Sequence, residues 1–202
     1  MRISELSRVT GVPVATVKYY LREGLVPPGR ATGATQAQYD DSHVQRLRLA
    51  RALVQVGGLS VAAARDVLAS LEAADGSLHD VLGAAHSALP PQLEEEREPR
   101  RARALAEALG WRVHPEAPAL RQLEHALRAL DDVGAPASEE RLAEYADAAR
   151  RIAELDVSGV PTTSRDEAAT AVVVGTVLWE PVLLALRRLA QEAVSAERLA
   201  QR

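Results

Sequence analysis

Apolar residues recur at helical spacing along most of this chain, and the alternation typical of strands is almost absent. Leu and Ala dominate, Phe is missing, and β-branched residues run together only at residues 172–174. Because residues three or four apart share one face of a helix, segments such as 61–72, 119–132 and 138–155 predict amphipathic helices. The pattern therefore predicts an all-α fold.

Two short helices about a tight turn are predicted at the amino terminus. ISELSRVT precedes Gly11-Val12-Pro13, VKYYLREGLV follows it, and the turn-prone segment PPGRATGATQAQYDD comes next. This order indicates a helix-turn-helix followed by a small β wing. Adjacent tyrosines on a helix cannot both face one core, so at least one should point outward. Hydroxyls and cations suit contacts to phosphates and base edges in a major groove, and we expect them from Thr16, Lys18, Tyr19, Tyr20 and Arg22.

The string from Ile3 to Glu72 resembles the amino-terminal domain of the MerR (mercury-resistance regulator) family of bacterial transcription regulators. Lys18–Pro28 stands where the family has an Arg-Tyr-Tyr type helix end, an acidic-basic turn, Gly-Leu and prolines. Tyr39-Asp40-Asp41 stands where the family has a tyrosine and an acidic stretch. The helix after Gly57-Gly58 matches the family's second wing, whose amino terminus can offer backbone N–H groups to phosphate.

The first wing departs from the family pattern. The family's Gly-Tyr-Arg motif is replaced by GATQAQ at residues 33–38, so the wing arginine is missing. Its phosphate contacts are expected to pass to Arg30 or to the amides of Gln36 and Gln38. Tyr39 has two interpretations: a wing tyrosine can pack the wing onto the domain, and its hydroxyl can contact phosphate.

The resemblance also implies a mechanism. Family members are homodimers, joined by a long antiparallel helix pair after the DNA-binding domain, and they bind a pseudo-palindrome in double-stranded DNA. An effector in the carboxy-terminal region changes the dimer so that it twists an over-long promoter spacer, with RNA polymerase as a further partner at the promoter. Because distorting a duplex costs energy, such a switch is a bistable dimer biased by its ligand.

The sequence predicts two domains. Residues 1–75 form the DNA-binding domain, a hinge is expected at Ala74-Asp75-Gly76, and residues 77–202 form an all-helical dimerisation and effector domain of about five helices. The segment GTVLWEPVLLALRRLAQE resembles the last helices of TetR-type regulators, which form a ligand pocket and a dimer interface. The dimer contact is expected from helices near 77–109 together with Val172–Leu189.

Capping and breaking residues punctuate the second domain. Ser60, Ser77 and Ser138 are expected to open helices, and Ser164 with Glu167 fits a capping box for a long final helix. Pro90-Pro91 should stop one helix, and Pro181 should kink the last one. The mixed charges of EEEREPRRAR are expected to form a solvated helix face.

Charge is divided unevenly along the chain. The net charge is −4, yet residues 1–75 hold nine Lys or Arg against seven acids, and the remainder carries a balance of −6. DNA is bound by local basic patches, so the amino-terminal third is the part expected to bind it.

Several classes of function are disfavoured. The chain has no cysteine, which removes disulfides, thiolate metal sites and thiol redox switching. No two histidines lie three or four residues apart, and no nucleophile-elbow, phosphate-loop or zinc-protease motif is present, so neither a metal cofactor nor an enzyme is expected. MRISELSR lacks the apolar core of a secretory signal, which predicts a cytoplasmic protein. Ala168–Leu186 has about the length of a membrane span but holds Glu180 and Pro181, so a buried helix is expected there.

The carboxy-terminal region offers few groups for an effector. Trp111, Tyr145, Trp179 and Glu180 could line a pocket for a small, largely apolar ligand. Buried core is the competing interpretation for the three aromatic residues, and capping a backbone opened by Pro181 is the competing interpretation for Glu180.

The sequence thus predicts a sequence-specific transcription regulator. Two alternatives remain open, namely an architectural DNA-binding protein without an effector and a regulator whose carboxy-terminal helices bind a partner protein.

Overall fold

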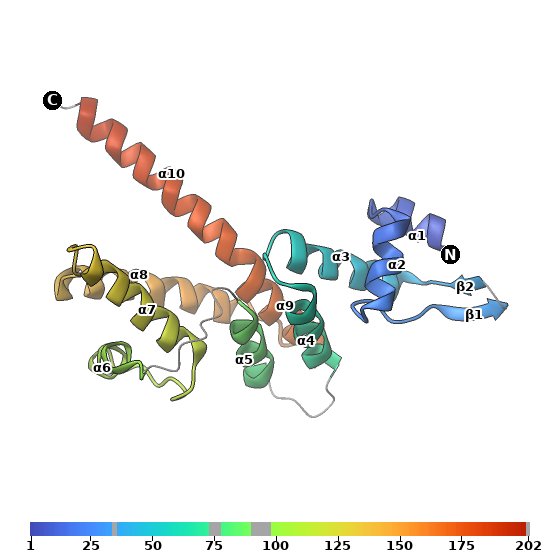
Figure 1. Cartoon of the computed structure of the whole chain (residues 1–202), viewed down its shortest axis with the longest axis horizontal. Helices are drawn as coiled ribbons and strands as arrows, with labels where there is room; N and C mark the ends of the chain where they lie inside the picture. Colours follow the sequence, from blue (N-terminus) through green and yellow to red (C-terminus); the bar gives the residue numbers. More distant parts are fainter. Residues whose placement is uncertain (34–35, 73–77, 90–97, 201–202) are drawn as a thin grey trace.

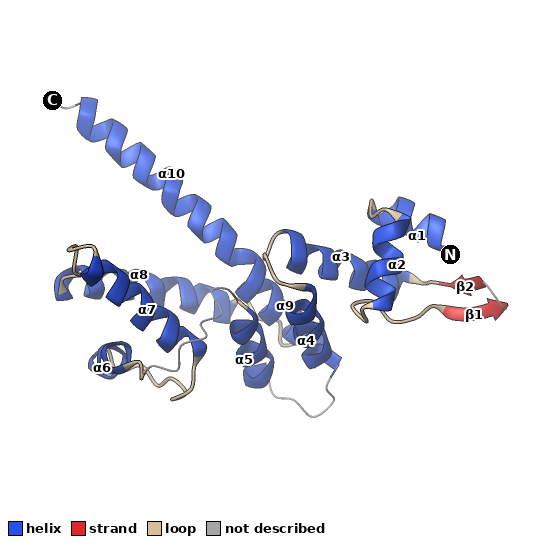
Figure 2. Ribbon diagram, in the orientation of Figure 1, coloured by secondary structure: helices blue, strands red, loops and turns tan. Residues whose placement is uncertain are grey.

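The structure is a computed structural model, and it describes residues 1–33, 36–72, 78–89 and 98–200. Helices dominate these ranges, and the described strands form a single antiparallel hairpin (Figure 2). The predicted all-α fold with a small β wing is confirmed. The elements are α1 (Ile3–Thr10), α2 (Val14–Arg22), β1 (Arg30–Gly33), β2 (Gln36–Gln38), α3 (Asp41–Gln55), α4 (Val61–Glu72), α5 (Leu78–Ala88), α6 (Arg100–Ala108), α7 (Pro118–Asp132), α8 (Glu139–Ser158), α9 (Arg165–Val173), the π-helical turn η1 (Val174–Leu178) and α10 (Trp179–Ala200).

The helix-turn-helix forms where the sequence predicts it. Gly11 ends α1 with a φ of 67°, in the left-handed region that favours glycine. The Ser7 hydroxyl donates a hydrogen bond to the Val12 carbonyl at 2.6 Å, which closes the turn locally. Arg51 of α3 donates to the carbonyl oxygens of Thr10 and Gly11 at 3.4 and 3.5 Å. A third helix therefore holds the end of α1 and the turn that follows it.

One buried cluster connects the amino-terminal helices with part of the carboxy-terminal region. Leu6, Leu47, Leu53 and Leu68 are fully buried in it, and each buried leucine contributes about 1.5–3 kcal/mol relative to an exposed one. The same cluster continues into α5, α9 and η1 through Val81, Ala85, Ala169, Val173 and Val177. These three elements thus pack on the DNA-binding module, mainly against α4 (Figure 1).

Several predicted boundaries are confirmed and others lie outside the described residues. Ser60 accepts a hydrogen bond from the Ala63 N–H at 3.1 Å, and Ser138 accepts one from the Arg141 N–H at 3.3 Å. α5 ends at Ala88, just before the prolines that were expected to stop it. The predicted hinge at 74–76, the cap at residue 77 and the prolines at 90 and 91 fall outside the described ranges.

A buried carboxylate holds α6 against α7. Glu124 is 5% exposed, and its carboxylate accepts hydrogen bonds from the backbone N–H groups of Arg101 and Ala102 at 2.8 and 3.1 Å. Arg128, one turn along α7, donates to the same carboxylate at 3.1 Å. Burial opposes ionisation, but these three donors hold the pKa of Glu124 below its usual value. Glu124 therefore acts as a tertiary cap for the start of α6, which no cap residue of its own supplies.

We expect Glu124→Ala to lower the free energy of unfolding by about 2 kcal/mol, because the buried N–H of Ala102 and the partly buried N–H of Arg101 lose their acceptor. Denaturant titration at neutral pH measures this loss. A carboxylate with a lowered folded pKa stabilises the protein above its unfolded pKa of about 4.3, and the contribution disappears as pH falls through the folded pKa. The gap between parent and variant should thus narrow in acid. Glu107→Ala, at an exposed position of α6, is the control and should change stability little.

The final helix is capped as expected, but its irregularity lies earlier than expected. Ser164 accepts a hydrogen bond from the Glu167 N–H at 3.2 Å, while the Glu167 carboxylate accepts one from the Thr163 hydroxyl. A kink was expected at Pro181. The chain makes the π-helical turn η1, which ends at Leu178, three residues before Pro181. In a regular α-helix the carbonyl of Val177 would accept a hydrogen bond from the N–H of residue 181. Because proline has no N–H to donate, a π turn is one way for the helix to continue past it.

The last helix leaves the body of the protein. α9 and η1 are buried through Ala169, Val173 and Val177, whereas Trp179 and Leu186 are each 57% exposed. The prediction of a buried helix over 168–186 is therefore correct up to η1 and wrong from Trp179 onward, where α10 projects away from the other helices (Figure 1). Residues 167–200 form one continuous helical stretch that is long and apolar enough to cross a membrane by those two criteria.

Candidate DNA interface and helical cleft

The second helix of the helix-turn-helix presents a cationic and aromatic surface. Tyr19 is 37% exposed, and the Arg22 guanidinium lies 5.1 Å from the centre of its ring. Arg22 also donates to the Glu23 carboxylate at 3.2 Å. Lys18 lies one turn before Arg22, is exposed, and has no ion-pair partner among the residues that the structure describes. α2 therefore offers two cations and an aromatic ring to a ligand on one side.

Tyr20 points the other way. Its side chain is 3% exposed within the core, and burial raises its pKa, against the opposing charge of Arg51. Successive residues on a helix differ in direction by about 100°, so the neighbouring tyrosines face different surroundings. The expectation that Tyr20 contacts DNA is corrected: it is a core residue that helps to place Tyr19. Thr16 is half-buried, at the edge of the exposed surface.

The wing is a two-stranded antiparallel hairpin that brings Arg30 and Gln38 together. These residues are opposite each other in the pairing register, and Arg30 donates to the Gln38 side-chain oxygen at 3.2 Å. Gln36 is exposed and pairs with Gly33 near the tip. Two of the three predicted wing contacts thus form one unit at the base of the hairpin, and the third lies apart from them.

Tyr39 anchors the wing to the domain. It is 8% exposed and meets the His43 ring edge-on, with ring centroids 5.3 Å apart. Its backbone exchanges hydrogen bonds with Met1, since the Tyr39 N–H donates to the Met1 carbonyl at 2.9 Å and the Met1 amino group donates to the Tyr39 carbonyl at 2.6 Å. Of the two interpretations of this residue, the structure favours packing.

Asp40 connects the wing to α3. Its carboxylate accepts from the Ser42 hydroxyl at 2.5 Å and lies 2.7 Å from Nδ1 of His43. The Ser42 bond, and then the His43 bond, hold the pKa of Asp40 far below its usual value. A charged residue thus caps α3 and fixes the direction in which the wing leaves the domain.

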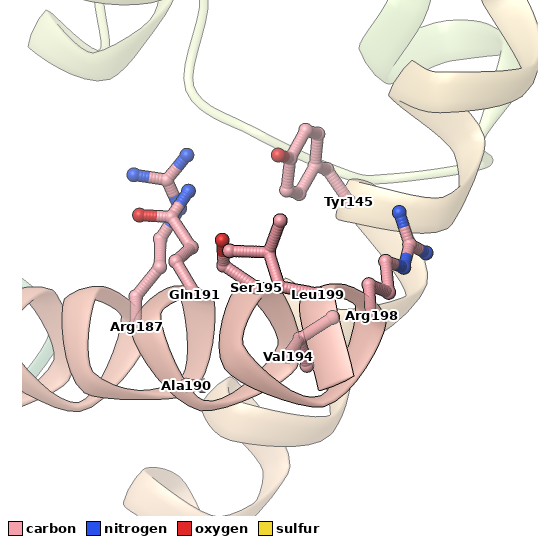
Figure 3. A pocket seen from close by; sticks show the side chains of 8 residues that line it. All are labelled: Tyr145, Arg187, Ala190, Gln191, Val194, Ser195, Arg198 and Leu199. Atoms are coloured by element: carbon pink, nitrogen blue, oxygen red, sulfur yellow. The ribbon is translucent and has the colours of Figure 1, made fainter. Parts of the chain in front are cut away.

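A cleft lies between α8 and α10 in the carboxy-terminal region. It has a volume of about 580 Å³, and Tyr145 of α8 faces a side of α10 that carries Arg187, Gln191, Ser195 and Arg198 (Figure 3). The Arg187 guanidinium lies 5.9 Å from the Tyr145 ring centre, and a hydrogen bond from Arg187 lowers the pKa of Tyr145. The remaining lining groups are Ala190, Val194 and Leu199.

The four predicted effector residues are not brought together. Tyr145 is the one among them that lines the cleft. Trp111 is half-buried and packs on a small cluster between α6 and α7, and Trp179 is exposed at the start of α10. Glu180 is half-buried, and that burial raises its pKa. The cleft therefore has one of the four predicted residues in its lining.

Comparison with known proteins identifies the amino-terminal module. The family model for MerR HTH family regulatory proteins matches residues 1–71. The HTH-type transcriptional regulator ZntR homolog of Haemophilus influenzae is 40% identical over 47 residues, which cover 23% of this chain and 35% of that protein. The HTH-type transcriptional regulator MerD of Acinetobacter calcoaceticus is 36% identical over 74 residues, which cover 37% of this chain and 60% of that protein.

Residues 1–71 form a MerR-type helix-turn-helix domain. The chain matches less than two thirds of the length of these two curated relatives. A crystal structure extends the similarity to the whole molecule. That of the candidate transcriptional regulator SCO5550 from Streptomyces coelicolor A3(2) shares 40% identity and a TM-score of 0.71, covering 98% of this chain and 97% of that one. Over its whole length the chain is thus similar to a candidate transcriptional regulator, and its residues 1–71 match the MerR HTH family.

In this MerR domain, the predicted site residues did not include an exposed cation that lies next to the end of α2. Arg65 of α4 lies beside the end of α2, with its Cδ 3.7 Å from where a side chain on Gly24 would begin. It belongs to the helix that matches the family's second wing. The sequence feature that could have identified Arg65 is its position as a basic residue in the first half of that helix. Arg46 has a different role, because it is largely buried and donates to the carbonyl oxygens of Leu25 and Leu68.

Proposed function

We propose that this MerR-type regulator binds a two-fold-related site in double-stranded DNA, with α2 in the major groove and the wing along the phosphate backbone. The observation that carries the proposal is the exposed set of Lys18, Tyr19 and Arg22 on α2. Arginine and lysine suit phosphate and guanine contacts, and an aromatic ring that supports a guanidinium restricts its motion. Arg30 and Arg65 would extend the cationic surface on either side of α2.

Selection of DNA fragments from a random pool tests this function. An enriched motif with two-fold symmetry is the expected result, because a symmetric dimer reads two equivalent half-sites. An architectural DNA-binding protein, the main alternative, would retain DNA without enriching any motif.

The wing offers a sharper test within the same function. We expect Arg30→Ala to weaken binding roughly tenfold and to lower the salt dependence, because a phosphate-neutralising cation is removed. Gln38→Ala should cause a smaller loss, since it frees the Arg30 side chain without removing its charge. Gln36→Ala serves as the matched amide control and should bind like the parent in fluorescence anisotropy at several salt concentrations. If Gln36→Ala binds weakly while Arg30→Ala binds like the parent, this assignment is wrong.

We further infer a homodimer, because one winged domain covers one half-site. The contact was expected from helices near 77–109 together with Val172–Leu189. Val81, Ala85, Val173 and Val177 are buried within the single chain, so α5, α9 and η1 offer less apolar surface than α10 does. A monomer in light scattering at micromolar concentration, without DNA, would contradict the inference. Contact with RNA polymerase and a cytoplasmic location remain predictions.

We also infer that a small, largely apolar effector controls the dimer. The cleft beside Tyr145 supports this, because its volume of about 580 Å³ lies within the range of about 300–1,000 Å³ usual for small-molecule sites. A ligand that binds only the folded state raises the melting temperature. Thermal-shift screening of apolar metabolites should therefore give hits that Tyr145→Ala abolishes. Hits that survive this substitution would place the effector elsewhere, and a screen without hits would favour regulation by a partner protein.

A further inference from the structure

α10 carries an apolar stripe that no other described element covers. Six apolar residues follow one another at alternating intervals of three and four, and all are exposed. We call them the α10 seam: Trp179, Val182, Leu186, Leu189, Ala193 and Ala196. Alternation of three and four residues is the repeat that keeps one edge of a helix facing a partner helix in a coiled coil.

The seam is separate from the cleft. The cleft-lining residues of α10 begin with Arg187 and continue with Gln191, Ser195 and Arg198 on the side that faces Tyr145 (Figure 3). None of the six seam residues lines the cleft. α10 therefore has one side turned to α8 and another that is apolar and open, and Leu189 in that open side is 62% exposed. An apolar surface of this length marks a site of association.

We propose that the α10 seam pairs with the α10 seam of a second copy, antiparallel, with the two-fold axis between Arg187 and Arg188. This pairing rests on the homodimer proposed above and identifies the helix that forms the dimer interface, which we call the joint. In this register Leu186 packs on Leu189 of the partner subunit, Val182 on Ala193 of the partner subunit, and Trp179 on Ala196 of the partner subunit. The joint is thus the last helix, in place of the long helix pair directly after the DNA-binding domain. α5 spans 11 residues and contributes Val81 and Ala85 to the core of its own chain.

Side-chain size favours the antiparallel direction. The seam is bulky at its start, with Trp179, Val182 and Leu186, and it is small at its end, with Ala193 and Ala196. Antiparallel pairing places each bulky residue against a small one, which fills space without voids or clashes. Parallel pairing would place tryptophan against tryptophan at one end and leave only alanine pairs at the other.

Charge favours the same direction. Glu192 and Glu197 flank the seam on opposite sides, five residues apart. In a parallel pair, these are the two flanking positions that meet across the interface, so the glutamates of the two chains would repel each other twice. In the antiparallel register Glu192 faces Ala185 of the partner subunit. The acidic residues therefore act against the parallel dimer and leave the antiparallel one undisturbed.

Cysteine cross-linking tests both the joint and its direction, because the chain has no cysteine of its own. We expect Val182→Cys and Ala193→Cys, co-expressed as two full-length chains, to form a disulfide-linked heterodimer in air. Neither single variant should cross-link to itself, since two copies of one position would lie about 16 Å apart along the helix axis. A disulfide requires Cα atoms within about 7 Å. Gln191→Cys, on the cleft side, is the control and should not cross-link.

Other outcomes would overturn the proposal. Single variants that cross-link to themselves would show a parallel pair. A dimer in light scattering without any cross-link would place the joint elsewhere. A monomer that floats with phosphatidylglycerol vesicles would show that the seam binds a lipid surface and not a second copy of the chain. Leu186→Glu provides an independent measurement, and it should raise the dimer dissociation constant at least roughly a hundredfold, because it buries a charge in the seam. Gln191→Glu adds the same charge on the cleft side and should leave the dimer intact.

The seam and the function fail separately in these experiments. Heterodimer cross-linking without an enriched DNA motif would support the joint and contradict the proposed function. An enriched two-fold motif without cross-linking would do the reverse.

Discussion

Replacing Lys18 and Arg22 together by alanine is expected to weaken DNA binding roughly a hundredfold, about tenfold for each cation removed. Both side chains are exposed on α2, and removing one phosphate-neutralising cation lowers the slope of log affinity against log salt by about one. Arg22 has an additional role, because its guanidinium lies over Tyr19 and the ring would become freer without it. Anisotropy titrations at four or more salt concentrations measure both the affinity and the slope.

The chain provides a direct probe of the same interface. Lys18 is its only lysine, so an amine-specific acylating reagent modifies Lys18 and, besides it, the terminal amino group. Bound DNA should protect Lys18 in a mass-spectrometric assay. Arg112→Ala, at an exposed position in the carboxy-terminal half, is the control for the loss of a cation and should bind DNA like the parent. Equal labelling of Lys18 with and without DNA would remove it from the interface.

Gly57→Ala is expected to lower the free energy of unfolding by about 3 kcal/mol, at the upper end of what overpacking costs. A Cβ at this position would lie 2.3 Å from a methyl carbon of Val177 and 2.8 Å from the Leu53 carbonyl oxygen. Val177 is fully buried in η1, so the methyl carbon has little room to move. The substitution should separate η1 from the end of α3, and thereby loosen the packing between the DNA-binding module and the last helix.

A double-mutant cycle isolates that packing. Val177→Ala removes the nearer obstacle, so Gly57→Ala combined with Val177→Ala should destabilise the protein less than the sum of the two single changes, by about 1 kcal/mol. Gly83→Ala is the control, and it should raise the free energy of unfolding where Gly57→Ala lowers it. Apart from its chain neighbours and the nearby backbone of α5, no atom of the described residues lies within 4 Å of its Cβ position, and alanine is the better helix former there by roughly 0.5–1 kcal/mol. Additive effects of the first two substitutions in chemical denaturation would contradict the steric account.

Features that depend on neighbours in the chain could be predicted from the sequence alone. The turn at Gly11, the caps at Ser60, Ser138 and Ser164, and the end of α5 each involve groups within a few residues of one another. Their hydrogen bonds form or fail locally, so residue type is sufficient to predict them. The winged helix-turn-helix followed from several such signals in a fixed order, and the spacing of cations on α2 predicted the exposed cationic surface of that helix.

Only the tertiary structure could decide which of two equivalent local choices the chain makes. The sequence required one tyrosine of the pair to point outward, but only the packing of the core determines that Tyr20 is the buried one. From the sequence, Glu124 is indistinguishable from an exposed acidic residue of an amphipathic helix. Only the tertiary structure shows that the first N–H groups of α6 donate to its carboxylate. Likewise, residue type alone could not show that the predicted effector residues lie on different elements. Trp111 follows α6, Tyr145 lies on α8, and Trp179 and Glu180 begin α10.

The last helix shows the limit most clearly. From η1 into α10 the sequence is almost uniformly apolar, and composition predicted burial for all of it. Burial requires a neighbour, and α9 and η1 have α4 and α5, while the seam of α10 has none within the described chain. The hydrophobic effect is non-directional, so covering an apolar stripe is favourable whatever apolar surface covers it. The stripe alone therefore does not identify its neighbour. The sequence therefore determined that α10 is apolar, and only the packing of the other helices left its seam without a neighbour among the described residues.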